Sequence, residues 1–184
     1  MTHYVCADLR SDYISRAITE VADFPQDGVV FRDITTMLAN PKALRYSIDL
    51  LHERYHNYGL TQVVAVEARG FIFAAALADR LGIGLTLIRK PGKLPRPTFQ
   101  ESYELEYGNS ALELHKDALT HRDRVVVMDD MLATGGTINA AINLVKQTPA
   151  TIVEAAFVAE LLYLPGRKRL AEKGISSYAI VAYD

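Results

Sequence analysis

The chain has 184 residues, of which 49% are apolar, so it is long enough for one full hydrophobic core and short for two typical domains. Its 20 basic and 22 acidic residues give a net charge of −2, which excludes a general attraction to nucleic acid or anionic lipid. A single cysteine cannot form an internal disulfide, the first residues lack a signal-peptide pattern, and no apolar run approaches the about 20 residues of a membrane span. We therefore expect one domain over residues 1–184 that is soluble and cytoplasmic, without nucleic-acid or membrane partners.

The amino-terminal part of the chain predicts two helices. Residues 11–23 suggest the first, which the turn sequence at 24–28 ends. Asn40 is a typical cap for the second, with Pro41 in its first turn and Gly59 just beyond its end. Apolar side chains recur along one face of this second helix at steps of four, three and four: Leu44, Ile48, Leu51 and Tyr55.

From Thr61 onward the pattern alternates between strands and helices. Residues 62–66 and 124–128 are continuous apolar runs rich in β-branched side chains, which are typical of parallel strands covered on both faces. Helical stretches follow them, and the sequence predicts helices at 71–82, 138–147 and from about 166, with further strands at 85–88, 151–161 and 177–184. This order predicts an α/β fold with a central, mostly parallel sheet flanked by helices.

One region, between Arg89 and Asp123, breaks the alternation. Its second half has period two, with Tyr103, Leu105 and Tyr107 on one face and Glu104 and Glu106 on the other, then a Gly108-Asn109 turn and a return strand. The Pro- and Lys-rich first half has few apolar side chains that could anchor it. We expect a hairpin arm that projects from the sheet and a mobile segment before it.

The stretch VVVMDDMLATGGT, residues 125–137, joins a strand end to a helix start. Ligands of open α/β sheets bind at the carboxyl ends of strands, so the location suits a site. The glycines of ATGGT permit close backbone approach, and the amides and dipole of the following helix favour a phosphate. Asp129 and Asp130 can accept hydrogen bonds from sugar hydroxyls or face a magnesium-bearing part of the ligand. The carboxylates and the glycine loop together therefore predict that the ligand is a phosphorylated sugar.

Other interpretations of the same residues are weaker. The chain contains neither GxxxxGK[ST] nor a GxGxxG after a strand, so a P-loop and a dinucleotide fold lack support. A Gly-Gly pair before a helix is often only turn chemistry. The Asp129-Asp130 pair on the preceding apolar strand shifts the weight to a ligand site.

Residues 125–137, VVVMDDMLATGGT, resemble the phosphoribosyl pyrophosphate (PRPP) binding motif of type I phosphoribosyltransferases. The resemblance covers nearly the whole chain and is greatest to the branch of the family that acts on adenine, through FPQDGVVFRDIT (24–35), EARGF (67–71), RKPGKLP (89–95) and SYELEYG (102–108). It implies that family's fold, with a hood segment for base recognition at 1–38 and a flexible loop and hairpin arm at 89–122. The implied reaction is purine salvage: adenine and PRPP give AMP and pyrophosphate, with Mg²⁺.

The resemblance also implies a role for each residue of the motif. Asp129 and Asp130 bind the ribose hydroxyls, and the loop Ala133, Thr134, Gly135, Gly136 and Thr137 wraps the 5′-phosphate. As pyrophosphate leaves, the ribose C1 gains oxocarbenium-like positive charge, which nearby carboxylates stabilise. Both roles favour ionised carboxylates.

Two further groups are assigned to pyrophosphate by the resemblance: Glu67, Ala68, Arg69 and Gly70 in one loop, and Arg89, Lys90 and Lys93 in another. Arg69 can bind phosphoryl oxygens bidentately. The second group reaches the site of a neighbouring subunit, which implies a homodimer; its alternative interpretation is a solvated loop. Pro91 departs from the family's pattern. No protein side chain is expected to bind Mg²⁺ directly, since PRPP, pyrophosphate and water hold it.

Proton transfer is expected from a residue outside the PRPP motif. Relatives that act on hypoxanthine or guanine carry an aspartate where this chain has Ala133. The matching candidate here is Glu106, which would hydrogen-bond N7 of adenine and assist deprotonation at N9. Tyr107 would close over the site against water, and Arg69 completes the predicted catalytic set. A glutamate on the polar side of a hairpin is otherwise usually solvent-facing.

Adenine itself is assigned to the segment VVFRD. The backbone around Arg32 pairs with the base edge, while Val30 and Met131 lie along its faces, and Phe31 is either part of this wall or core. A backbone amide and carbonyl can read N1 and the 6-amino group, whereas a 6-oxopurine reverses that donor and acceptor pattern.

Two alternatives stay open at this point. The first is a regulator that keeps the PRPP-binding fold to sense purine or PRPP, although residues 1–23 lack the basic surface that nucleic-acid binding needs. The second is a phosphoribosyltransferase for another base such as xanthine, against which Ala133 and the 102–108 segment count.

Overall fold

The computed structural model describes residues 8–104 and 109–184. The backbone contacts divide the chain into two units, Met1–Leu51 and His52–Asp184, and each is described by itself. The expected hood segment at 1–38 falls within the first unit and the expected loop and arm at 89–122 within the second. The single-domain organisation stays a prediction.

The first unit begins with a helix and a small hairpin. Its elements are α1 (Leu9–Ala17), β1 (Thr19–Ala22), β2 (Val30–Asp33), α2 (Thr35–Leu38) and the start of α3 (Pro41–Tyr55). The prediction of one helix over 11–23 is wrong beyond Ala17, because Thr19–Ala22 pairs antiparallel with β2. Ile18, Thr19 and Val21 are β-branched, and such side chains lose rotamer freedom in a helix and favour a strand.

The start and the buried face of α3 agree with the sequence pattern. The Asn40 side chain accepts hydrogen bonds from the amides of Lys42 and Ala43, each at 3.1 Å, so two of the unpaired donors of the first turn are satisfied. Ile48, Leu51 and Tyr55 are buried. Helix α3 is therefore fixed by a local cap and by burial of one apolar face.

The second unit contains the central sheet. Its strands are β3 (Gln62–Val66), β4 (Gly84–Ile88), β7 (Arg124–Met128), β8 (Met131–Leu132), β9 (Thr151–Leu161) and β10 (Ser177–Tyr183), and its helices are α4 (Gly70–Leu81), α5 (Gly136–Lys146) and α6 (Gly166–Glu172). The strand order is β10-β9-β7-β3-β4, with β8 also paired to β9, and every pairing is parallel. The predicted α/β architecture with a mostly parallel sheet is confirmed.

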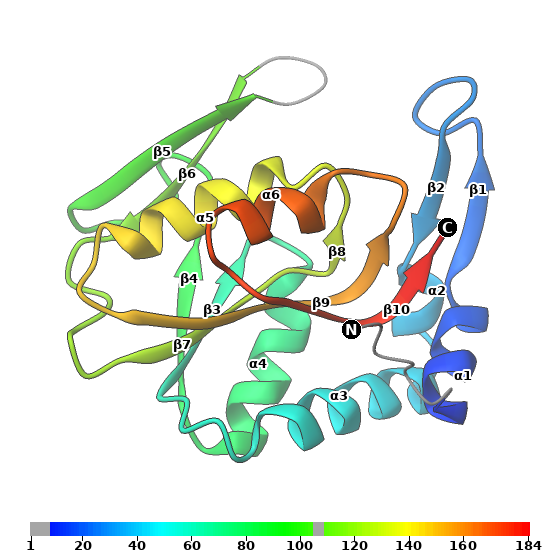
Figure 1. Cartoon of the computed structure of the whole chain (residues 1–184), viewed down its shortest axis with the longest axis horizontal. Helices are drawn as coiled ribbons and strands as arrows, with labels where there is room; N and C mark the ends of the chain where they lie inside the picture. The colour runs from blue at the N-terminus through cyan, green and yellow to red at the C-terminus, as the bar shows by residue number, and fades with distance from the viewer. Residues whose placement is uncertain (1–7, 105–108) are drawn as a thin grey trace. The chain divides into compact units, whose positions relative to one another are not determined.

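Helices cover both faces of this sheet, with α5 and α6 on one face and α4 on the other (Figure 1). Alternate residues of β3 and β7, among them Val64, Val66, Val125 and Val127, belong to the same buried cluster as the inward face of α5. After their first residues, Gln62 and Arg124, the predicted strands 62–66 and 124–128 are apolar and buried on both faces. Among the described residues, no helix combines the length and apolarity needed to cross a membrane.

The predicted hairpin is present as β5 (Thr98–Glu104) and β6 (Asn109–His115), paired antiparallel. Leu112 and Leu114 are buried in the core cluster, and Phe99 and Tyr103 pack against it. The predicted hairpin arm is thus a two-stranded sheet of its own beside the central sheet, and its apolar face packs on α5. A strand that buries one face in this way has a fixed register.

A buried ion pair stabilises the second unit away from the strand ends that carry the predicted motifs. Glu154 on β9 is 4% exposed and accepts two hydrogen bonds from the Arg54 guanidinium, each at 2.7 Å, and one from the Tyr55 hydroxyl at 2.8 Å. The carboxylate raises the pKa of Arg54. Burial, together with the same carboxylate, raises the pKa of the Tyr55 hydroxyl. Three polar groups thus satisfy one another inside the fold.

We predict that Glu154→Ala destabilises the protein by about 3 kcal/mol, because it leaves a buried hydroxyl and a half-buried guanidinium without their acceptor. Urea denaturation followed by circular dichroism measures the change. Glu172→Ala removes an exposed carboxylate and serves as the control, with an expected change below about 0.5 kcal/mol. Equal stability of the two variants would contradict a stabilising role for the Glu154 cluster.

Candidate active site

Three loops lie side by side at the carboxyl ends of β4, β3 and β7. The parallel register pairs Val66 with Ile88 and Ala65 with Met128, so these strands end at nearly the same level. The segments that follow them, 67–70, 89–93 and 129–137, contain most of the site residues that the sequence predicts (Figure 1). Since ligands of open α/β sheets bind at this edge, we take it as the candidate active site.

The two carboxylates Asp129 and Asp130 are held in a gap between β7 and β8. Their backbones remain bonded to β9: the Asp129 amide donates to Ala156 at 3.1 Å, and the Asp130 carbonyl accepts from Val158 at 3.0 Å. The side chains are buried, at 9% exposed for Asp129 and 4% for Asp130. The sheet therefore presents two adjacent carboxylates that water hardly reaches.

Charge at this strand end is partly balanced by Arg69. Its Nε lies 2.5 Å from Asp130 Oδ2. Burial and the neighbouring Asp130 carboxylate raise the pKa of Asp129 well above its ordinary value. We expected both carboxylates to be ionised. At Asp129, burial and the neighbouring Asp130 carboxylate oppose ionisation unless a cation binds nearby.

Gly70, at the start of α4, packs directly on the end of β7. A Cβ at this position would lie 2.8 Å from the Met128 carbonyl oxygen and 3.1 Å from Asp129 Cα. The predicted close approach of the backbone at Gly70 is present, and its neighbour is the acidic pair. Only glycine lets the 67–70 loop, whose Glu67–Ala68 peptide bond is cis, come this near to Asp129.

Glu67 connects the 67–70 loop to the basic segment after β4. Its carboxylate accepts a hydrogen bond from the Lys90 amide at 2.9 Å and two from the Arg89 guanidinium, each at 3.3 Å. Burial opposes ionisation of Glu67, but the Lys90 amide and the Arg89 guanidinium outweigh it and lower the pKa of this carboxyl. Both predicted pyrophosphate segments are therefore parts of one connected structure.

Pro91 lies in a tight turn of residues 90–93. The Lys93 amide donates to the Lys90 carbonyl at 3.3 Å, and Gly92 has a φ of 74°. Proline at the second position and glycine with positive φ at the third are typical of a type II turn. The departure of Pro91 from the family's pattern is thus accommodated, and the Lys90 and Lys93 side chains stay exposed.

The predicted phosphate loop, residues 133–137, turns from β8 into α5. Gly135 has a φ of 85°, which disfavours side chains other than glycine. In the described part of the chain, no group accepts a hydrogen bond from the amides of Thr134, Gly135 or Gly136. Three unpaired amides at a helix start are suited to an anion.

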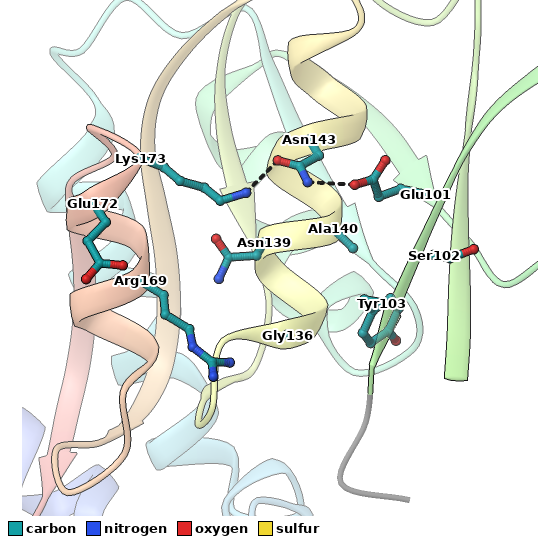
Figure 2. Close-up of a pocket in the computed structure, with 10 residues that line it drawn as sticks. All are labelled: Glu101, Ser102, Tyr103, Gly136, Asn139, Ala140, Asn143, Arg169, Glu172 and Lys173. Carbon is teal, nitrogen blue, oxygen red and sulfur yellow. Dashed lines mark hydrogen bonds between the residues drawn. The ribbon is translucent and has the colours of Figure 1, made fainter. Parts of the chain in front are cut away.

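Beside this loop, a cavity of about 400 Å³ lies between α5, α6 and β5. Figure 2 shows its polar side chains: Lys173 donates to Asn143, which in turn donates to Glu101, each at 2.6 Å. Arg169 extends from α6 toward the loop that precedes Gly136. The cavity is thus bordered by the start of α5 and by two cationic side chains.

The remaining predicted site residues fall elsewhere. Val30, Phe31 and Arg32 lie on β2 in the first unit, where Arg32 pairs with Glu20 at 2.6 Å and Phe31 packs edge-on against Phe24. Met131 lies on β8 in the second unit. Glu106 and Tyr107 lie outside the described residues. Within 8–104 and 109–184, no group of three or more His, Cys, Asp or Glu side chains is arranged to hold a metal ion.

Several residues around the site were not found from the sequence. Gly166 and Arg169 on α6 and Asn139 on α5 donate hydrogen bonds to the carbonyls of the 133–137 loop. The sequence offers one signal, the run LPGRKR directly after a long strand, but no local spacing connects it to a loop about thirty residues earlier.

Comparisons with known proteins bear on the same residues. A family model described as "Phosphoribosyl transferase domain" matches residues 33–179. The chain is 48% identical over 179 residues to the adenine phosphoribosyltransferase of Pectobacterium atrosepticum, covering 97% of each sequence. Its structure is similar to the adenine phosphoribosyltransferase of Thermoanaerobacter pseudethanolicus, with a TM-score of 0.88 at 44% identity over 94% of this chain and 99% of that one. It is also similar to the Saccharomyces cerevisiae adenine phosphoribosyltransferase, complexed with D-2,5-dideoxy-2,5-imino-altritol 1,6-bisphosphate and adenine, with a TM-score of 0.86 at 34% identity over 94% and 98% of the chains.

We predict that Asp129→Asn raises the thermal midpoint, and that this gain grows as pH rises above about 4, the ordinary pKa of an aspartate. Because the folded state raises the pKa of Asp129 above its ordinary value of 3.8, the folded protein binds a proton that the unfolded chain releases above that pH. Wild-type stability therefore falls with pH through this one group, and asparagine removes that fall. Differential scanning calorimetry across the pH series measures it.

Asp79→Asn, which removes an exposed carboxylate at the end of α4, is the control for loss of one charge. A gain from Asp129→Asn that is the same at every pH would contradict the burial argument.

Proposed function

Because the chain belongs to the phosphoribosyltransferase family, we propose that it is a purine-salvage enzyme that transfers the 5-phosphoribosyl group from PRPP to adenine, giving AMP and pyrophosphate. Its α/β fold is that of the type I members. The observation that carries the proposal is the combination, at one strand end, of two buried carboxylates with a loop of three amides that have no partner in the part of the chain that the structure describes. A phosphorylated sugar needs both.

The proposed PRPP site divides the ligand between these two parts. The amides and hydroxyls of the loop Ala133–Thr137 bind the 5′-phosphate, helped by the dipole of α5. Asp129 and Asp130 accept hydrogen bonds from the ribose hydroxyls. As the bond from C1 to pyrophosphate lengthens, the developing positive charge at C1 favours the ionised form of Asp129, and the carboxylate stabilises that charge in return. The raised pKa of Asp129 supports this role, because a carboxyl that is disfavoured as an anion in the free protein gains most from a nearby cation.

Pyrophosphate is proposed to bind the segments after β3 and β4. Arg69 and the backbone of Ala68 and Gly70 supply donors on one side, and Arg89, Lys90 and Lys93 supply cations on the other. Glu67 keeps the two segments together through Arg89 and the Lys90 amide. Magnesium, carried by the diphosphate and water, would neutralise charge on the leaving group. The carboxylates of Asp129 and Asp130 face the ribose in this scheme.

Adenine is proposed to bind the β2 segment Val30–Arg32 together with Met131, with Glu106 as the proton-transfer group and Tyr107 closing the site. The relatives that match over nearly the full length are named for adenine, which supports this choice of base. Ala133 supports it too, because it offers no carboxylate at the place where 6-oxopurine enzymes carry one.

The proposal extends to assembly and location. The family resemblance supports a homodimer, in which the 89–93 segment of one subunit reaches the pyrophosphate of its neighbour, and a cytoplasmic enzyme. Light scattering at several protein concentrations tests the first, and fractionation of cells that express the protein tests the second.

The reaction is tested by incubating the purified protein with PRPP and Mg²⁺ and, in turn, adenine, hypoxanthine, guanine and xanthine. We expect AMP to form from adenine, and any nucleotide from the 6-oxopurines to form much more slowly. The reason is that the donor and acceptor pattern at the edge of a 6-oxopurine is reversed. Chromatography of the nucleotides measures the products. Product from another base would reassign the substrate, and no product from any base would make the PRPP-sensing regulator the better hypothesis.

Proton transfer is tested by Glu106→Gln. We expect kcat with adenine to fall by about 100-fold or more, since a positioned acid or base contributes about 10²- to 10⁴-fold. Glu104→Gln, a matched change two residues away, should retain activity. Stopped-flow or steady-state assay of AMP formation measures both variants. Equal rates for Glu106→Gln and wild type would move proton transfer to another residue and leave the reaction itself unaffected.

A further inference from the structure

Helix α6 is fixed to the sheet immediately beside the phosphate loop. The carboxylate of Glu160, buried near the carboxyl end of β9, pairs bidentately with Arg167, whose Nε lies 2.7 Å from Oε1. Leu170, on the same helix, is fully buried in the core cluster. An ion pair and an apolar side chain three residues apart thus fix the position of α6, and the residues between them have a defined place.

The first residue of α6 is in contact with the phosphate loop. The Gly166 amide donates to the Ala133 carbonyl at 3.1 Å. A Cβ on Gly166 would come within 2.7 Å of Leu132 Cδ1, and one on Gly135 would lie 3.0 Å from Gly166 Cα. The two glycines therefore let the loop and the start of α6 approach at backbone distance.

Two side chains continue this contact along the loop. The Arg169 guanidinium donates to the Thr134 carbonyl at 2.9 Å, and the Asn139 amide donates to the Gly135 carbonyl at 2.7 Å. Figure 2 shows Arg169 reaching from α6 to the loop and Asn139 on the first turn of α5. Three consecutive carbonyls, those of Ala133, Thr134 and Gly135, are thus each bonded to a donor outside the 133–137 loop.

Peptide geometry connects these carbonyls to the amides that an anion would meet. In a planar trans peptide the C=O and the following N–H point in opposite directions. Tying the carbonyls of 133, 134 and 135 toward α6 and α5 therefore turns the amides of Thr134, Gly135 and Gly136 the other way. These are the amides without a partner among the described residues. A cationic donor on the Thr134 carbonyl also polarises that peptide and strengthens the Gly135 N–H as a donor.

We propose that Arg169 is a positioning residue for the 5′-phosphate: by holding the Thr134 carbonyl it keeps the loop in the conformation whose amides bind the anion. The inference rests on the proposed function of residues 133–137. Arg169 itself does not touch the ligand in this scheme. Its loss should weaken ligands that carry the 5′-phosphate and spare pyrophosphate, which binds the segments after β3 and β4.

The test is isothermal titration of wild type, Arg169→Ala and Arg169→Lys with ribose 5-phosphate and, separately, with pyrophosphate and Mg²⁺. We expect Arg169→Ala to weaken ribose 5-phosphate by about tenfold, through loss of one charge-assisted hydrogen bond. The KM for PRPP should rise in parallel. Arg169→Lys should recover most of the affinity, because an ammonium group can still donate to one carbonyl.

Lys168→Ala is the matched control, since it removes the same charge from the same helix at an exposed position. It should change ribose 5-phosphate affinity by no more than about twofold, because among the described residues only Arg169, and not Lys168, donates a side-chain hydrogen bond to the loop from this helix. Pyrophosphate affinity should stay at the wild-type value in all three variants.

Unchanged ribose 5-phosphate binding by Arg169→Ala would overturn the inference, and so would equal weakening of both ligands or an effect as large from Lys168→Ala. The proposed function fails by a different result, the absence of AMP from the wild-type protein with any base. A wild type that makes AMP while Arg169→Ala keeps its KM for PRPP would thus reject the positioning role alone.

Discussion

The pairing of two short strands along one long strand is the constraint on which the site depends. Strand β9 pairs first with β7 and then with β8, and the two residues between those strands, Asp129 and Asp130, keep their backbone bonds to it. The chain can therefore place two carboxylates in a buried position without leaving the sheet. Everything else described at this edge is arranged around them: Gly70 packs on Asp129, Arg69 pairs with Asp130, and the 133–137 loop begins where β8 ends.

Burial of this acidic pair opposes stability, and the fold supplies compensation elsewhere. Desolvation disfavours the charged form of Asp129, which is the form that the proposed mechanism uses when positive charge develops on the sugar. The Glu154 cluster on the same long strand shows the opposite solution, because there the buried carboxylate is fully paired with Arg54 and Tyr55. Strand β9 thus carries Glu154, whose charge is fully paired inside the core, and it also pairs with the segment that carries Asp129 and Asp130, whose charges are only partly paired and can therefore meet a ligand. Strained or destabilised groups of this kind are expected at functional sites.

Much of the fold could be predicted from the sequence because its signals are local. The Asn40 cap, the apolar face of α3 and the β-branched runs at 62–66 and 124–128 each act within a few residues, and the structure has all of them. The same reasoning was wrong at 18–22, where a hairpin partner at 30–33 decides the conformation, and it left open the burial of Leu112 and Leu114, which depends on α5. In the site, the carboxylates and the glycine loop were readable as a motif. Two of their supports, Gly166 and Arg169, were not, since donors more than thirty residues from their acceptors leave no periodic trace.

The contact between α6 and the phosphate loop also has a consequence for how the protein is made. A ribosome synthesises Thr134 first and Arg169 thirty-five residues later, which at 5–20 residues per second is a delay of about 2–7 s. During that interval β9 and the anchor pair Glu160–Arg167 are also incomplete. The nascent chain therefore carries the whole phosphate motif before it carries the donors that shape it. Under the proposed scheme, the phosphate loop therefore reaches its full affinity only after Arg169 has been synthesised.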